Sequence, residues 1–107
     1  MAANPFLKQL TITTLNTNYS LLTLMQAIDA SVTGRCAKLN IQLDPSAGAA
    51  HLYIGNEDIS GSMYGAVLLA GQVKVWETAG MNIINASQIY LRSDTSGVKV
   101  NIDLLVQ

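Results

Sequence analysis

AKLNIQLDPSAGAAHLYIGN, residues 37 to 56, is the stretch that decides the fold class of this chain. Every second residue from 37 to 43 is apolar, which is the period of a β-strand with one buried face. Residues 44–48 then supply turn-forming side chains, after which Leu52 and Ile54 resume the alternation. We therefore expect two strands, paired with each other, in an all-β domain.

The same alternation recurs on both sides of this stretch. Strands are predicted at residues 7–15, 37–43, 52–56, 66–70, 73–77, 89–92 and 98–106. One short helix is predicted near residues 20–30, because four apolar residues follow helical spacing: Leu21, Leu24, Met25 and Ile28. Asn18 or Ser20 is placed to cap it. The prediction is a β-sandwich or jelly roll of about seven or eight short strands, forming a single domain over residues 7–107 after an N-terminal arm of residues 1–6.

Composition narrows the class of protein. Charged residues make up 12% of the 107 residues, against roughly 25% in ordinary domains, so we expect part of the surface to be covered by other subunits.

A net charge of −1 argues against a nucleic-acid or membrane-surface partner. The N-terminal segment lacks the apolar run of a signal peptide. Cys36 is the single cysteine and forms no internal disulfide, which fits synthesis in a cytoplasm.

Reactive side chains are sparse and scattered. His51 is the single histidine, so a His-based metal site or catalytic triad lacks partners. Cys36 follows a cation, Arg35, yet has no evident base, and it is expected at the edge of the core. Three carboxylates could in principle surround a hard cation, although their spacing matches no calcium loop: Asp44, Glu57 and Asp58. The sequence predicts no catalytic, cofactor or metal site and no enzyme.

Large apolar side chains at unexpected positions suggest a contact surface. Trp76 alternates with the valines of its strand, so it is exposed if the valines face the core. Met63 and Tyr64 lie in a glycine-bounded loop, and exposed aromatic and methionine residues are enriched at protein interfaces. The alternative is that the helix or residues 78–88 cover Trp76. The candidate contact residues are Met63, Tyr64, Trp76 and Met81, with Phe6 of the N-terminal arm.

The order of these signals resembles that of small virion proteins of tailed bacteriophages. The segments that carry the resemblance are LTITTL, RCAKLNIQLDPS, HLYIGNEDIS, LLAGQVKVWE and IYLRSDTSGVKVNIDLL. The resemblance implies a virion structural protein that decorates or cements the capsid shell, binds the major capsid protein and forms a homo-oligomer, a dimer or trimer. It further implies synthesis in the host cytoplasm. A free sheet edge along residues 7–15 could also pair with a neighbour. The linker SAGAA, Trp76 and the bulky 78–88 segment depart from the pattern.

Two other functions stay open at this point. One is a tail, connector or fibre-base component of the same particle. The other is a jelly-roll carbohydrate-binding module, or a degenerate cupin-like enzyme. A carbohydrate-binding module would use Tyr53, Tyr64 and Trp76 as its aromatic platform, whereas such an enzyme needs a metal cluster that one histidine does not supply.

Overall fold

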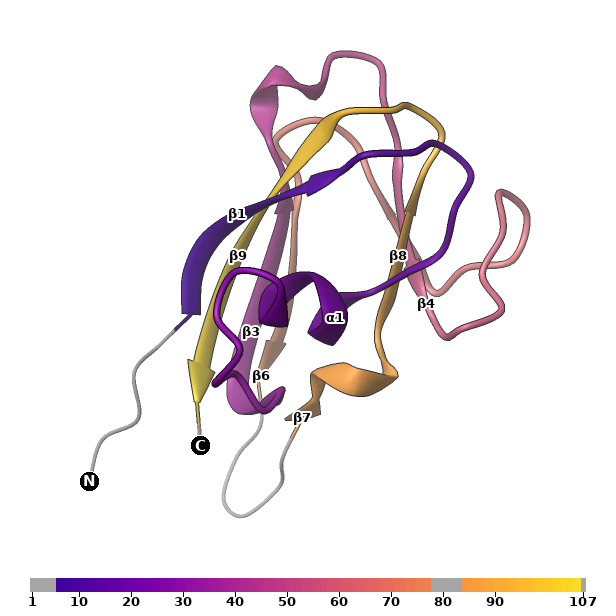
Figure 1. The fold of residues 1–107 in the computed structure, drawn as a ribbon. Helices are drawn as coiled ribbons and strands as arrows, with labels where there is room; N and C mark the ends of the chain where they lie inside the picture. The colour runs from indigo at the N-terminus through magenta and orange to yellow at the C-terminus, as the bar shows by residue number, and fades with distance from the viewer. Residues whose placement is uncertain (1–5, 78–83, 107) are drawn as a thin grey trace.

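Two antiparallel sheets enclose the core in the computed structural model, which describes residues 6–77 and 84–106. The elements are β1 (Phe6–Ile12), β2 (Tyr19–Ser20), α1 (Leu21–Gln26), β3 (Arg35–Leu43), η1 (Pro45–Ala47), β4 (Leu52–Gly55), β5 (Ala66–Leu68), β6 (Val73–Glu77), β7 (Ile84–Asn85), η2 (Ala86–Gln88), β8 (Tyr90–Ser93) and β9 (Val98–Val106). The larger sheet has the order β1–β9–β3–β6, with β7 also beside β3. The smaller sheet has the order β2–β8–β4–β5. Figure 1 shows the two sheets as facing layers, which confirms the predicted all-β sandwich.

The core lies between these layers and follows from the period of the two longest strands. In β3, Leu39, Ile41 and Leu43 are fully buried. Each lies beside a buried residue of the neighbouring strand β9. Burying one such side chain contributes about 1.5–3 kcal/mol. The bounds of β6 and β9 are the predicted ones, and the β3–β9 ladder keeps its register from Lys38 to Leu43 after a shift between Cys36 and Lys38.

The expected pairing of the strands at residues 37–43 and 52–56 is wrong. β3 pairs with β9 on one side and with β6 and β7 on the other, so both of its edges are occupied. β4 belongs to the opposite sheet, between β8 and β5. Residues 44–51 carry the chain across the core, and Asp44 caps η1 by accepting a hydrogen bond from the Ser46 N–H (3.1 Å). This connection is longer than the 2–5 residues typical of hairpin loops.

The helix is shorter than predicted. Ser20 caps α1, accepting a hydrogen bond from the Thr23 N–H (3.4 Å). Leu21 and Met25 are fully buried members of the core, whereas Ile28 lies beyond the helix and is 49% exposed. A helix of one or two turns is marginal in isolation. It persists here because it closes one open side of the sandwich with these two residues (Figure 1).

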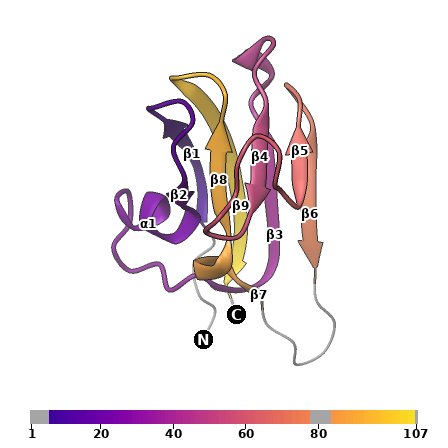
Figure 2. The same ribbon diagram turned by 90° about the vertical axis from the view of Figure 1, so that its right-hand side faces the viewer.

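Each outer strand has a feature that disfavours strand addition. Figure 2 shows β1 and β6 at opposite sides of the molecule. Lys8 of β1 lies opposite Ile102, and Lys74 of β6 opposite Ile41, so each edge of the larger sheet carries a lysine on its inward face. The edges of the smaller sheet are the very short strands β2 and β5. Inward charges and short edges are known protections against edge-to-edge pairing. The edge expected along residues 7–15 therefore exists at β1, but it is protected.

Candidate interaction surface

The loop of residues 56–65 joins β4 to β5 and is held in place from inside. Ile59 anchors it, with only 3% of the residue exposed. The Asn18 amide nitrogen donates hydrogen bonds to the main-chain oxygens of Glu57 (3.1 Å) and Ile59 (2.9 Å). The Asn18 side-chain oxygen accepts a hydrogen bond from Arg92 (3.1 Å). A buried anchor and satisfied carbonyls give the loop one defined conformation.

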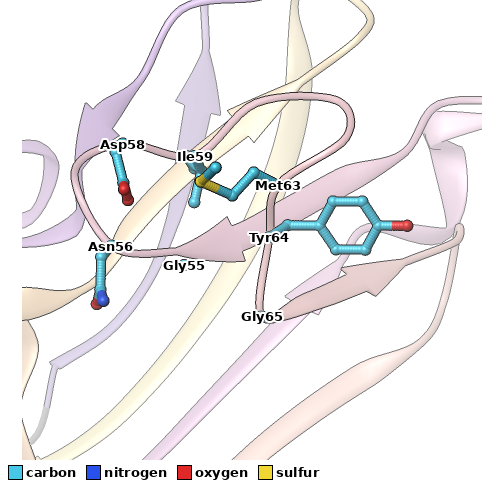
Figure 3. A pocket seen from close by; sticks show the side chains of 7 residues that line it. All are labelled: Gly55, Asn56, Asp58, Ile59, Met63, Tyr64 and Gly65. Atoms are coloured by element: carbon cyan, nitrogen blue, oxygen red, sulfur yellow. The ribbon is translucent and has the colours of Figure 1, made fainter.

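This loop presents two of the predicted contact residues to solvent. Met63 is 58% exposed and Tyr64 is 44% exposed, as the sequence leads one to expect. A hollow of about 350 Å³ lies within the loop, lined by Gly55, Asn56, Asp58, Ile59, Met63, Tyr64 and Gly65. Figure 3 shows the Met63 side chain extending toward Ile59, whereas the ring of Tyr64 points away from the loop. The two residues thus offer apolar surface in two directions.

An aromatic row continues from Tyr64 along the outer face of the smaller sheet. The ring centroids of Tyr64 and Tyr53 are 5.0 Å apart with a tilt of 46°, and those of Tyr53 and His51 are 6.2 Å apart and nearly parallel. Tyr53 also lies opposite Arg92 in the register of β4 and β8. We call His51, Tyr53 and Tyr64 the aromatic row. Tyrosine and arginine are typical of interface centres. The alternation of residues 51–54 indicates the outward position of Tyr53, but the contact with Tyr64 depends on the loop.

His51 has a partner that sequence reasoning missed. Its Nδ1 lies 2.7 Å from the Asp94 carboxylate, and its backbone N–H donates to the other oxygen of that carboxylate (2.9 Å). Partial burial raises the pKa of Asp94, but hydrogen bonds from His51 and Thr95 outweigh burial and hold the pKa below its ordinary value. The pair joins the start of β4 to the turn after β8. It fixes one end of the aromatic row, and no signal in the sequence links positions so far apart.

The structure decides between the two orientations that the sequence leaves open for β6. Val73 and Val75 point outward and are 49% and 50% exposed. Trp76 lies opposite the buried Leu39, so its indole is partly buried and packs against the core. The Nζ of Lys74 stands 5.7 Å from the centre of the indole ring. Trp76 is thus neither a free surface residue nor a fully buried one.

The two remaining candidates cannot be placed as contact residues. Phe6 is the first residue of β1, one position inside the predicted arm, and its side chain is outside the described part of the structure. Met81 also lies outside the described residues.

The structure gathers no reactive cluster from the residues that it describes. No group of three or more histidines, cysteines or carboxylates within 6–77 and 84–106 could hold a metal ion. Burial raises the pKa of the Cys36 thiol to about 11, and its Sγ lies 3.7 Å from the carbonyl oxygen of Ile84. A thiol with such a pKa is a poor nucleophile at neutral pH.

Comparisons with known proteins assign no family. No family model, curated protein or solved structure matches the chain. Within the described residues, no helix has both the length and the hydropathy needed to cross a bilayer.

Proposed function

We propose that this protein is a virion structural protein that decorates or cements a phage capsid shell through protein–protein contacts, with the major capsid protein as its partner. The resemblance of its strand order to that of small virion proteins is the reason for placing the protein on a phage particle. The observation that carries the contact role is the aromatic row, which lies on the outer face of the smaller sheet and ends at the exposed Tyr64, with Met63 exposed next to it in the loop. Such a composition is typical of the energetic centre of an interface.

The sheet edges favour contact through faces. Lys8 and Lys74 would each be buried beneath a strand added to the larger sheet, at the cost of removing an ammonium group from water. The outer face of the smaller sheet carries no lysine at described positions, and Tyr53 and Arg92 lie side by side on it. This face is therefore the surface that we assign to the capsid, and copies of the protein associate without strand addition.

Quantitative mass spectrometry of purified particles tests the assignment to the virion. Hundreds of copies per particle, in a fixed ratio to the major capsid subunit, are expected for a shell protein. A few copies would move the protein to the tail, connector or fibre base. Its absence from particles would overturn the proposal.

Binding to particles lacking this protein tests the assigned surface. Tyr64→Ala should weaken binding about 30-fold, the factor that corresponds to the 2 kcal/mol of a hot spot. Leu15→Ala is the matched control, because Leu15 is exposed to a similar extent (43%) and lies in the turn after β1. Equal affinity of both variants, with unfolding midpoints unchanged, would contradict the role of the aromatic row.

A further inference from the structure

Two hollows meet at the open end of the sandwich where β4 ends and η2 begins. The first, of about 290 Å³, opens between the layers, with Trp76, Ile54 and Ile89 among its walls. The second, of about 330 Å³, is lined by polar residues and by Tyr90. Asn56 and Gln88 line both hollows. The two spaces therefore adjoin at a pair of side-chain amides, and each contains one aromatic ring.

The amides at this junction differ from most others in the chain. Side-chain amides that hydrogen-bond within the protein are those of Gln9, Asn18, Gln26, Asn40, Gln42, Gln72, Asn85 and Asn101. Within residues 6–77 and 84–106, the side chains of Asn56 and Gln88 have no such bond. Asn16 is the other exception, and it lines neither hollow. Two of the three free amides thus share one site.

The backbone beneath both amides is fixed. Asn85 caps η2 by accepting a hydrogen bond from the Ser87 N–H (3.1 Å), and the Leu21 N–H donates to the carbonyl oxygen of Ile89 (3.0 Å). The carbonyl oxygen of Asn56 accepts from the Ile59 N–H (3.2 Å). Because the backbone is fixed, ligand binding would have to order only the two exposed side chains and not the loop that carries them.

We propose that the two hollows bind two adjacent rings of a neutral oligosaccharide. An amide both donates and accepts, as a sugar hydroxyl does, so Asn56 and Gln88 suit hydroxyls between the two rings. Trp76 lines the first hollow and Tyr90 the second, and the apolar surface of each aromatic ring suits the C–H groups of a pyranose ring. Lys74 in the first hollow and Glu57 in the second add one hydrogen-bonding head group each.

This site goes beyond the proposed function and does not depend on it. It would let a protein on a particle surface hold a polysaccharide. A peptide is the less suitable occupant. It would need free backbone groups to pair with, whereas the Gly65 N–H on the wall of the first hollow already donates to the carbonyl oxygen of Ile54 (2.8 Å).

Fluorescence titration tests the proposal on the intact chain, because Trp76 is its single tryptophan. Linear gluco-, manno- and chito-oligosaccharides of one to six units are the probes. We expect a saturable change in Trp76 emission for at least one series, with disaccharides or longer binding at least tenfold more tightly than the monosaccharide. Gln88→Ala and Asn56→Ala should each weaken binding about threefold to tenfold, as expected for one lost hydrogen bond. Asn16→Ala, which removes a free amide elsewhere, should leave the affinity for the sugar unchanged.

Three outcomes would overturn the proposal. One is the absence of a saturable response to every series at millimolar concentration. Another is equal affinity of the Asn16→Ala and Gln88→Ala variants for the same sugar. A third is a response to a pool of unstructured peptides with none to sugars, which would assign the hollows to a protein ligand. None of these results bears on capsid binding, which is measured separately through Tyr64.

Discussion

Replacing Gly55 by alanine should displace the loop that carries Met63 and Tyr64. A Cβ built at Gly55 would lie well inside van der Waals contact with Cγ2 of Ile59, whereas its other neighbours would be at ordinary distances. Gly55 does not have a left-handed backbone, so this contact is the main penalty. Carbon atoms pack at about 3.5–4.0 Å, so the buried Ile59 methyl must move by more than about 1 Å. Overpacking of this kind costs about 1–3 kcal/mol.

Urea unfolding followed by far-UV circular dichroism measures this cost. Gly61→Ala is the matched control, because Gly61 lies in the same loop and a Cβ there would meet nothing within 4 Å. The control should change the free energy of unfolding by less than about 0.5 kcal/mol. Both variants should keep the wild-type m-value, since the exposed surface on unfolding is unchanged.

A double-mutant cycle isolates the contact itself. Ile59→Ala removes Cγ2 and should cost about 2–5 kcal/mol alone. Because the alanine at 55 then has no methyl to meet, the double variant should be no less stable than Ile59→Ala. The interaction energy would equal the Gly55→Ala cost with opposite sign. Additive costs, or equal stabilities of Gly55→Ala and Gly61→Ala, would refute the reasoning.

Two further predictions follow from ionisable side chains. The folded-state pKa of Asp94 is lowered, so the stabilisation that its hydrogen bonds with His51 provide is present above about pH 4 and is lost as the pH falls through the folded-state pKa. The thermal midpoint of Asp94→Asn should therefore fall less than that of the wild type between about pH 6 and pH 3; parallel falls would contradict this. Lys8→Val removes the inward lysine of β1 and should increase concentration-dependent light scattering, while Lys99→Val, on the outward face of the central strand β9, should not. Equal scattering by both variants would show that Lys8 does not protect the edge.

Part of the interaction surface was readable from the sequence. The glycines on either side of Met63 and Tyr64 predict a loop, and a loop lies on the surface, so the exposure of these residues follows from local chemistry. The contact of Tyr53 with Tyr64 and the His51–Asp94 pair were not readable, because each joins residues that are brought together by the packing of β4 against the loop or β8. The junction of Asn56 and Gln88 has the same origin, since its two amides come from distant segments.

By itself the sequence determined the two longest strands, because the period of apolar residues along 37–43 and 98–106 is a local property that each strand must satisfy to bury one face. The tertiary structure alone decided which strands pair and which face of β6 is buried. β3 and β4 are neighbours in the chain but lie in opposite sheets, since β9 and β6 occupy both edges of β3. In β6 one face carries two valines and the other carries Trp76, so the alternation of apolar residues does not show which face is buried. The register that sets Trp76 opposite Leu39 makes that choice.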